Sequence, residues 1–271
     1  MAELDLAARA RGLRRLVLET VAATGKGHIG GAYSCLDLLV ALYHGGQFRH
    51  RPSEPQWEGR DRFILSKGHA AVALHAVLAD AGYFPVALLA RTGKEGCLLG
   101  EHPDPRTPGI EVGTGSLGNG LGIGTGLALA DCQSGRPNRT VVLLGDGECY
   151  EGSVWEAAQY AAHLKLASLV AILDLNGQIT MDYTRDCNDF GDMGAKWRAF
   201  GWEVLEVEGH AFEALGPVLA EALSGRAGKP TLVLARTVKG KGVSFMEGKL
   251  AWHHGVPKPE QLAQAREELS A

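Results

Sequence analysis

Two short apolar runs in the second half of the chain constrain its fold more than any other feature. Residues 140–144 read TVVLL and residues 169–173 read LVAIL. Neither run alternates between apolar and polar residues, so both indicate strands that are buried on two faces, as in parallel sheets. The residues between them have helical spacing over 153–164. A strand, a helix and a second strand in this order predict a right-handed βαβ unit.

The same alternation extends over most of the chain. Further strands are expected at 62–66, 203–207 and 231–235, and further helices at 70–81, 193–200, 212–223 and 261–269. This pattern predicts an α/β fold, with a doubly wound, mostly parallel sheet flanked by helices. A long loop is expected over 93–114, where glycine and proline are frequent; long loops in compact domains are usually functional. We expect residues 1–271 to form one domain with a helical N-terminal extension and a C-terminal tail.

Two local patterns predict where helices begin. Apolar residues at helical spacing predict a first helix over about residues 4–22. Ser34 and Asp37 resemble a capping box, which places the start of a second helix at Ser34. Ser153 and Glu156 predict another capping box for the helix inside the βαβ unit.

Composition excludes several classes of protein. The net charge is −4, so nothing draws the chain toward nucleic acid or anionic lipid. The charge-free stretch 112–130 contains seven glycines, which argues against a membrane helix. Five cysteines without a CxxC pair exclude a disulfide framework and a structural zinc site, and favour a reducing compartment. Charged residues at the N-terminus, including Glu3, leave no apolar signal core, so we expect a cytoplasmic protein.

Polar residues follow both strands of the βαβ unit. Asp146, in Gly145-Asp146-Gly147, comes after the first strand, and Asn176 comes after the second. Because parallel strands end at the same edge of a sheet, the carboxylate and the amide oxygen are expected to lie together. Mg²⁺ prefers such oxygens and completes its shell with water and phosphate. Gly147 allows a phosphate to approach the backbone, and the following helix adds its positive end.

The spacing of these residues resembles a cofactor motif. Twenty-eight residues separate Gly147 from Asn176, as in the thiamine diphosphate motif GDG-x(25–30)-N. The whole segment 145–176 is similar to the transketolase family, and so are GKGHIGGA, SKGHA, GEHPD, GTGSLGNGLG and KGKGVSFME, which begin at residues 25, 66, 100, 113 and 239. The resemblance spans residues 10–257, and the motifs occur in order along it.

The resemblance implies a set of cofactor and metal ligands. Asp146, Asn176 and the backbone carbonyl of Gln178 would hold Mg²⁺, or Ca²⁺ or Mn²⁺ in its place. The third ligand follows the family less closely, since family members often show N-x-x-Q or N-K-I here and this chain reads NGQI. Glu151 would be the carboxylate that links the two active sites across the dimer. The residues that would contact thiamine diphosphate are His69, Gly115, Leu117, Gly145, Gly147 and Asn176.

Histidines are the expected proton-transfer groups. Imidazole suits sugar hydroxyls that gain and lose protons near neutral pH. By resemblance, His28, His102 and His254 would bind the sugar hydroxyls and move protons. His253 is adjacent to His254 and competes for this role, but HGVP at 254–257 is similar to the family's H-G-x-P. The other histidines, at 44, 50, 75, 163 and 210, are expected to be structural.

A rival motif is present in the glycine-rich loop. GTGSLG at 113–118 satisfies the dinucleotide fingerprint GxGxxG. That fingerprint follows a strand and precedes an acidic residue by about 20 positions. Here prolines precede it and Asp131 comes too early, so a dehydrogenase is disfavoured.

The resemblance implies an enzyme divided between two chains. Full-length transketolases are roughly twice this size, and the chain ends where their first domain ends. The second half normally supplies the glutamate and the aromatic ring that contact the aminopyrimidine. We expect one chain of a split transketolase rather than a truncation. It would be active only with a C-terminal partner subunit, in an α₂β₂ heterotetramer, and would transfer a two-carbon ketol unit from a ketose or ketose phosphate to an aldose.

Two alternatives remain open from the sequence. The first is a subunit of another thiamine diphosphate enzyme, such as a deoxyxylulose-phosphate synthase or a related ligase or decarboxylase. The second is a cofactor-binding subunit without catalytic activity. The sequence names neither the donor sugar nor the acceptor sugar.

Overall fold

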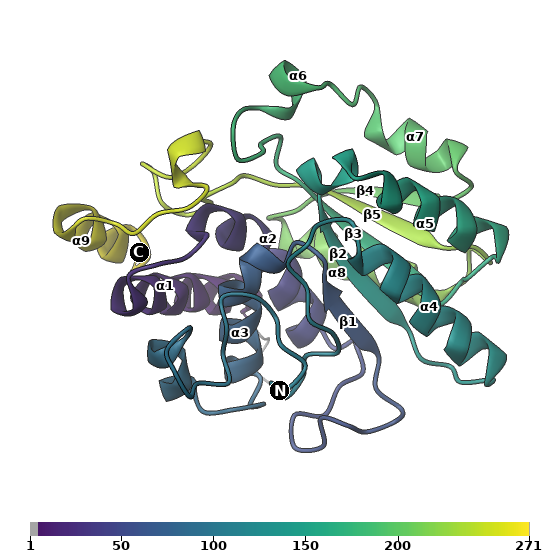
Figure 1. The fold of residues 1–271 in the computed structure, drawn as a ribbon, viewed down its shortest axis with the longest axis horizontal. Coiled ribbons are helices and arrows are strands. Elements are labelled where there is room, and N and C mark those ends of the chain that lie inside the picture. Colours follow the sequence, from purple (N-terminus) through teal and green to yellow (C-terminus); the bar gives the residue numbers. More distant parts are fainter. Residues whose placement is uncertain (1–4, 271) are drawn as a thin grey trace.

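Five parallel strands run through the middle of the molecule in the order β1-β2-β3-β5-β4 (Figure 1). The computed structural model describes residues 5–270. The strands are β1 (Arg62–Leu65), β2 (Thr140–Gly145), β3 (Leu169–Leu175), β4 (Glu203–Glu208) and β5 (Thr231–Arg236). Every residue of β2 is buried, and so is β3 up to Asp174. Burial on two faces explains their continuous apolar sequences.

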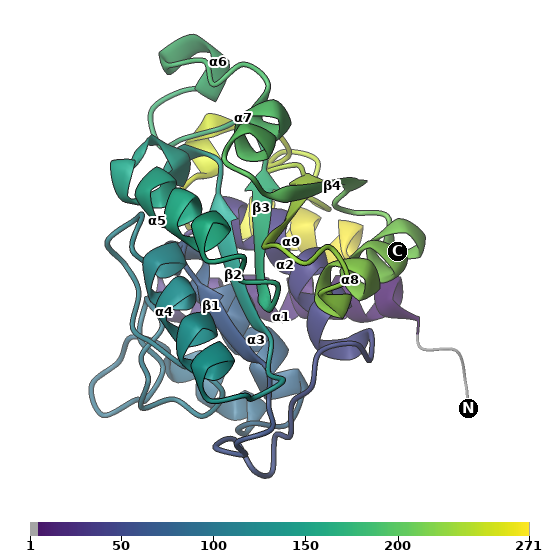
Figure 2. The same cartoon turned by 90° about the vertical axis from the view of Figure 1, so that its right-hand side faces the viewer.

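Helices cover both faces of the sheet. One apolar core joins the sheet to α1 (Leu6–Thr24), α2 (Ile29–His44), α3 (Ala71–Asp80) and α8 (Phe212–Ser224). The other joins it to α4 (Gly120–Gln133), α5 (Gly152–His163) and α7 (Met193–Ala199). Figure 2 shows α4 and α5 side by side on one side of the strands and α2 behind them. The remaining helix assignments are α6 (Thr184–Cys187), α9 (Pro259–Glu268), and the 3₁₀ turns η1 (Gly68–Ala70), η2 (Val86–Arg91), η3 (Gly147–Tyr150) and η4 (Leu250–Trp252).

This arrangement confirms the predicted α/β class. All four strand pairings are parallel, and all five strands lie within a residue or two of the predicted ranges. The segment 93–114 has turns and bends and no helix or strand, as expected for a loop. The first helix was predicted to begin near residue 4, which lies outside the described residues. Among residues 5–270, no helix is both long and apolar enough to cross a membrane.

Both predicted capping boxes are wrong. Helix α2 begins at Ile29, and Ser34 lies inside it with its hydroxyl 2.6 Å from Asp174 Oδ2. Helix α5 begins at Gly152, and the Ser153 hydroxyl donates to the Gly118 carbonyl at 3.0 Å. In both cases the hydroxyl bonds to a residue that is distant in sequence, which helix patterns alone do not reveal.

Helix α4 was not predicted from the sequence, because its glycines hide the helical pattern. Two of these glycines have a packing reason. A Cβ on Gly124 would lie 2.4 Å from a methyl of Val142, and one on Gly120 would lie 2.2 Å from Ser66 Oγ. The glycines therefore let α4 approach the sheet closely.

Candidate functional site

Asp146 lies immediately beyond the end of β2 and is almost fully buried. Its Oδ1 accepts a hydrogen bond from the Gly147 amide at 2.8 Å, and its Oδ2 accepts one from the Gly177 amide at 2.6 Å. Burial, together with the nearby Asp174 carboxylate, raises the pKa of Asp146 to about 6, although the two amides oppose this shift. The carboxylate is thus held by uncharged backbone amides, and a bound cation would compensate its buried negative charge.

Asn176 and Gln178 follow the carboxyl end of β3, the strand that pairs with β2. The register pairs Gly145 with Asp174, so the residues that follow β2 and β3 face each other across the edge of the sheet. The Asn176 amide oxygen accepts from the Gln178 amide at 3.1 Å. The Gln178 side chain is buried, and its Oε1 has no hydrogen-bond partner among residues 5–270.

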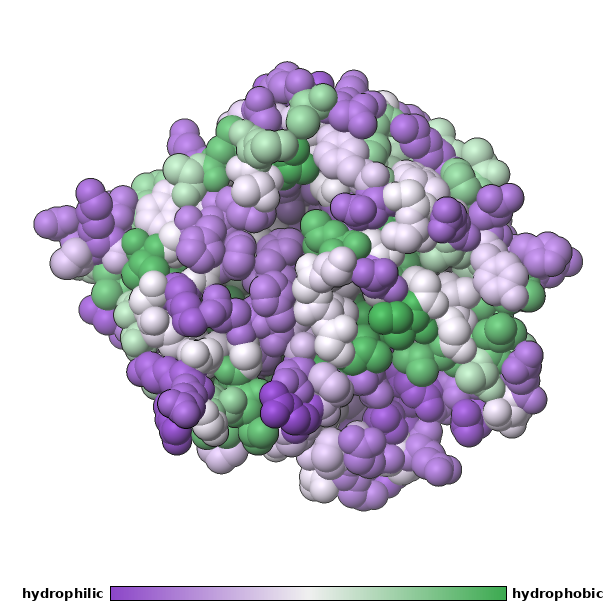
Figure 3. All heavy atoms as spheres, in the orientation of Figure 1, coloured by the Kyte–Doolittle hydropathy of each residue, from purple (hydrophilic) through white to green (hydrophobic). Residues whose placement is uncertain are grey.

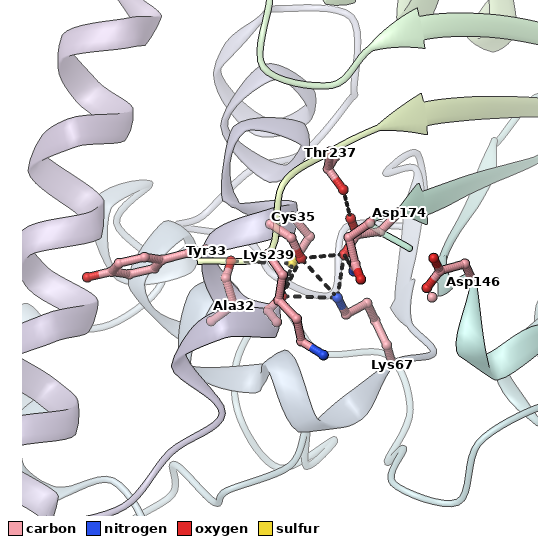
Figure 4. A network of polar contacts seen from close by, with 12 residues as sticks. Ala32, Tyr33, Cys35, Lys67, Asp146, Asp174, Thr237 and Lys239 are labelled. Atoms are coloured by element: carbon pink, nitrogen blue, oxygen red, sulfur yellow. Dashed lines mark hydrogen bonds and ion pairs between the residues drawn. The ribbon is translucent and has the colours of Figure 1, made fainter. Parts of the chain in front are cut away.

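Figure 4 shows a buried ion pair, formed by Lys67 and Asp174, on the same edge of the sheet as Asp146. The Lys67 ammonium contacts the Asp174 carboxylate, and both side chains are at most 2% exposed. Asp174 also accepts hydrogen bonds from Ser34 and Thr237. Burial alone would raise the pKa of Asp174, but Lys67 and these donors outweigh it and lower the pKa. The Asn176 Nδ2 lies 3.4 Å from Asp174 Oδ2, which turns the amide oxygen away from the pair.

These elements enclose a cavity of about 200 Å³. Figure 3 shows the face of Figure 1 hollowed near its centre, beside a column of hydrophilic residues. Eight of the predicted site residues line the cavity, namely His69, Leu117, Gly145, Asp146, Gly147, Glu151, Asn176 and Gln178. The structure therefore brings together the predicted metal ligands and most of the predicted cofactor contacts.

The donor set fits a divalent metal with a diphosphate. Within residues 5–270 no three His, Cys, Asp or Glu side chains form a metal-binding group, so a metal here would rely on one carboxylate and amide or carbonyl oxygens. Such a set suits Mg²⁺ that is shared with phosphate oxygens. A Cβ on Gly147 would lie 2.5 Å from the Ile179 side chain, so a larger residue beside Asp146 would have to displace Ile179.

Lys239 supplies a cation on the cavity wall. Its Nζ lies 2.8 Å from His253 Nδ1 and 3.4 Å from the Ile179 carbonyl. Burial and the nearby Lys67 lower the pKa of Lys239 to about 8. An anion in the cavity would offset the cost of burying this ammonium.

Four imidazoles gather beside the cavity. The ring of His28 lies 5.4 Å from that of His69, 5.5 Å from that of His253 and 4.7 Å from that of His254, measured between centroids. Burial and neighbouring positive groups lower the pKa of His28 and of His253 to about 4. Both rings are therefore neutral at pH 7 and can accept or donate a hydrogen bond.

The structure separates the two adjacent histidines that compete for one role. His253 lines the cavity, and its Nε2 lies 3.1 Å from the Thr180 hydroxyl. His254 is exposed and packs on His28 outside the cavity wall. The geometry thus favours His253 as the residue that faces the cofactor cavity.

His102 and Gly115 do not line the cavity, but they lie against each other. A Cβ on Gly115 would meet the His102 ring at 3.4 Å. His28 belongs to a second, smaller hollow that is shared with Lys26 and Glu101, whose charged groups form an ion pair. The predicted sugar-binding histidines therefore occupy the flank of the cavity rather than its wall.

Three residues at this edge carry no predicted role although their motifs were recognised. Lys67 lies in SKGHA, Lys239 begins KGKGVSFME, and Glu148 follows Asp146-Gly147. All three line the cavity. These segments resemble the transketolase family, and that resemblance is the signal that could have identified the three residues.

Comparison with known proteins gives a consistent family. A family model described as transketolase, thiamine diphosphate binding domain, matches residues 7–271. The 6-deoxy-6-sulfo-D-fructose transketolase subunit SqwG from Clostridium sp. (strain MSTE9) is 42% identical over 98% of this chain and 97% of its own length. In Phocaeicola vulgatus, one of the apulose-4-phosphate transketolase subunits is 42% identical over 95% of this chain and 91% of its own length.

A solved transketolase structure supports the same family assignment. The transketolase from Campylobacter jejuni superposes on the whole of this chain with a TM-score of 0.92 at 29% identity. This chain covers 43% of that protein.

Proposed function

Because the chain belongs to the transketolase family and matches its thiamine diphosphate-binding domain, we propose that it is the diphosphate-binding subunit of a split transketolase. The observation that carries the proposal is the meeting of Asp146, Asn176 and Lys239 in one cavity. A carboxylate, an amide oxygen and a buried ammonium suit a metal-bound diphosphate. The relatives named as transketolase subunits, which match this chain over most of their length, support the same conclusion.

The residues of this chain would position the cofactor and the metal. Asp146, Asn176 and the Gln178 carbonyl would hold Mg²⁺ at the ends of β2 and β3. Lys239 and the glycine backbone at Gly147 would face the diphosphate. When bound, thiamine diphosphate supplies a thiazolium that accepts the electrons of a carbon–carbon bond broken beside a ketose carbonyl.

Neutral imidazoles would handle the protons of the sugar. His253 Nδ1 would accept a hydrogen bond from the Lys239 ammonium, so its Nε2–H would act as a donor, to the Thr180 hydroxyl here or to a substrate oxygen. The ring of His28 makes no hydrogen bond within residues 5–270, which leaves its nitrogens free for a substrate hydroxyl. A neutral base near the reacting hydroxyl can accept its proton and return it, typically for about 10²–10⁴-fold in rate. His102 and His254 would contribute from the flank.

The proposal includes a second polypeptide. The cavity opens to the surface at Met181, which is 77% exposed, and Glu151 on its wall is also exposed. A C-terminal transketolase subunit would cover this opening and provide the groups that contact the aminopyrimidine. An α₂β₂ assembly would bring Glu151 near its counterpart across a two-fold axis. All five cysteines are unpaired, which suits the predicted cytoplasmic location.

The relatives are named for a sulfonated ketose and for apulose 4-phosphate. We therefore propose a ketose donor with an anionic terminus and an aldose acceptor.

Reconstitution tests the function. The chain and a candidate partner are purified separately, and transfer of a two-carbon unit is assayed for each alone and for the mixture, with thiamine diphosphate and Mg²⁺. Activity is expected only in the mixture, and calorimetry is expected to show cofactor binding that EDTA abolishes. Full turnover by this chain alone, metal-independent cofactor binding, or NAD binding would each contradict the proposal. Decarboxylation of pyruvate without ketose cleavage would point to a deoxyxylulose-phosphate synthase instead.

A paired substitution tests the histidine assignment. His253→Ala is expected to lower turnover more than His254→Ala, since only His253 faces the cavity. The reverse order would restore His254 to the role that the HGVP resemblance implies.

A further inference from the structure

Glu148 is a buried carboxylate that contacts three separate segments of the candidate site. It is 2% exposed and lies in η3, immediately after the Asp146 turn. Its Oε1 accepts from the Ser66 hydroxyl and from the Gly118 amide at 2.9 Å, and its Oε2 accepts from the Gly145 amide at 3.1 Å.

Each of these three segments carries predicted cofactor contacts. Ser66 begins the segment after β1 that includes His69. Gly118 ends the loop that includes Gly115 and Leu117, and Gly145 begins the turn that presents Asp146. We propose that Glu148 is a positioning residue that holds these three segments in register so that the cavity can bind a metal diphosphate.

The contacts extend to the fourth segment of the site. The hydrogen bond from the Gly145 amide to Glu148 fixes the turn that presents Asp146. Asp146 in turn accepts a hydrogen bond from the Gly177 amide at 2.6 Å, next to Asn176. Ser66 Oγ also accepts from the Gly120 amide at 3.1 Å, which ties in the start of α4. Glu148 and Asp146 together therefore connect the ends of β1, β2 and β3 with the glycine loop.

The chemistry of the contacts requires a carboxylate. All three partners of Glu148 are donors, and an ionised carboxylate is acceptor-only. Glutamine would keep one acceptor oxygen and turn an NH₂ group toward one of the donors. Gly118 adds a geometric constraint, because its φ is +83° and a Cβ there would lie 2.5 Å from Ser153 Oγ. The loop is therefore held at one defined place, and loss of its anchor would move it.

The role of Glu148 in cofactor binding rests on the proposed function, whereas its contacts do not. The test therefore compares Glu148→Gln and Glu148→Ala by two measurements. Hydrogen exchange of the chain alone reports on the backbone of residues 66–70, 114–120 and 145–147. Calorimetry with thiamine diphosphate and Mg²⁺ on the reconstituted complex reports on affinity. Glu156→Gln, an exposed carboxylate on α5, is the matched control.

We expect faster exchange in all three segments, greater for alanine than for glutamine, and no change in the control. Residues that orient metal ligands typically contribute 10–100-fold in affinity, so we expect that loss for alanine and a smaller loss for glutamine. The melting temperature is measured alongside, so that affinity is compared between folded proteins.

Two results would overturn the inference. One is unchanged exchange in the three segments of both variants. The other is faster exchange with unchanged cofactor affinity, including a case in which only the melting temperature falls. Absence of cofactor binding by the unsubstituted complex would instead refute the proposed function, and the exchange measurement would still decide whether Glu148 holds the segments together.

Discussion

His75 offers a quantitative test of how this fold responds to acid. It lies in α3, which packs against α1 and α2, and it is fully buried. Neither ring nitrogen has a hydrogen-bond partner among residues 5–270. Burial lowers the pKa of His75 from 6.5 to about 4, because the charged imidazolium would lose its hydration without gaining a partner.

The sign of the effect follows from proton linkage. Below pH 6.5 the unfolded chain binds a proton at His75 that the folded chain does not bind until about pH 4. The unfolded state is therefore favoured as the pH falls through this window, and stability is lost. A gap of about 2.5 pKa units corresponds to roughly 3 kcal/mol at most, and to about 2 kcal/mol at pH 5.

The assay is denaturant unfolding of the native chain and of His75→Leu at several pH values between 7 and 4. Several other histidines with a lowered pKa destabilise both proteins, so only the difference between the two curves reports on His75. We expect the variant to gain about 2 kcal/mol relative to the native chain between pH 7 and pH 5. His163→Leu, at an exposed histidine, serves as the control and should show no such gain. Parallel curves for the native chain and His75→Leu would refute the reasoning, as expected if an internal water satisfied the ring.

Three further predictions concern the site. Asp146→Ala is expected to weaken thiamine diphosphate binding, measured by calorimetry with Mg²⁺, by more than the 10–100-fold typical of residues that only orient metal ligands. An effect below tenfold would contradict its role as a metal ligand. His102→Ala is expected to lower turnover by about 10²–10⁴-fold with nearly unchanged cofactor affinity, and collapse of affinity with normal turnover at saturation would contradict this. His210 Nε2 accepts from the Val238 amide at 2.8 Å, so His210→Ala is expected to displace the adjacent Lys239 and weaken cofactor binding about tenfold; unchanged affinity with only a lower melting temperature would limit His210 to a structural role.

The sequence predicted the parts of the fold that depend on local burial. Strands β2 and β3 are recognisable because burial on two faces demands apolar residues throughout, whatever the neighbours are. The pairing of Asp146 with Asn176 followed from the same logic, since parallel strands place their carboxyl ends at one edge. Helix α4 was not predicted, because its glycines weaken the helical pattern. Close packing on the sheet stabilises this helix instead.

Only the tertiary structure decided which polar side chains meet. Ser34 looked like a helix cap, but its hydroxyl contacts Asp174, 140 residues away. Glu148 accepts hydrogen bonds from the amide of Gly118 and the hydroxyl of Ser66. The tertiary structure likewise decides that His253 faces the cavity while His254 is exposed. Residue type and spacing determine which element forms and where it ends, because they act through local burial and backbone geometry. Contacts between distant segments depend on how the elements pack, so the network that supports the site became visible only in three dimensions.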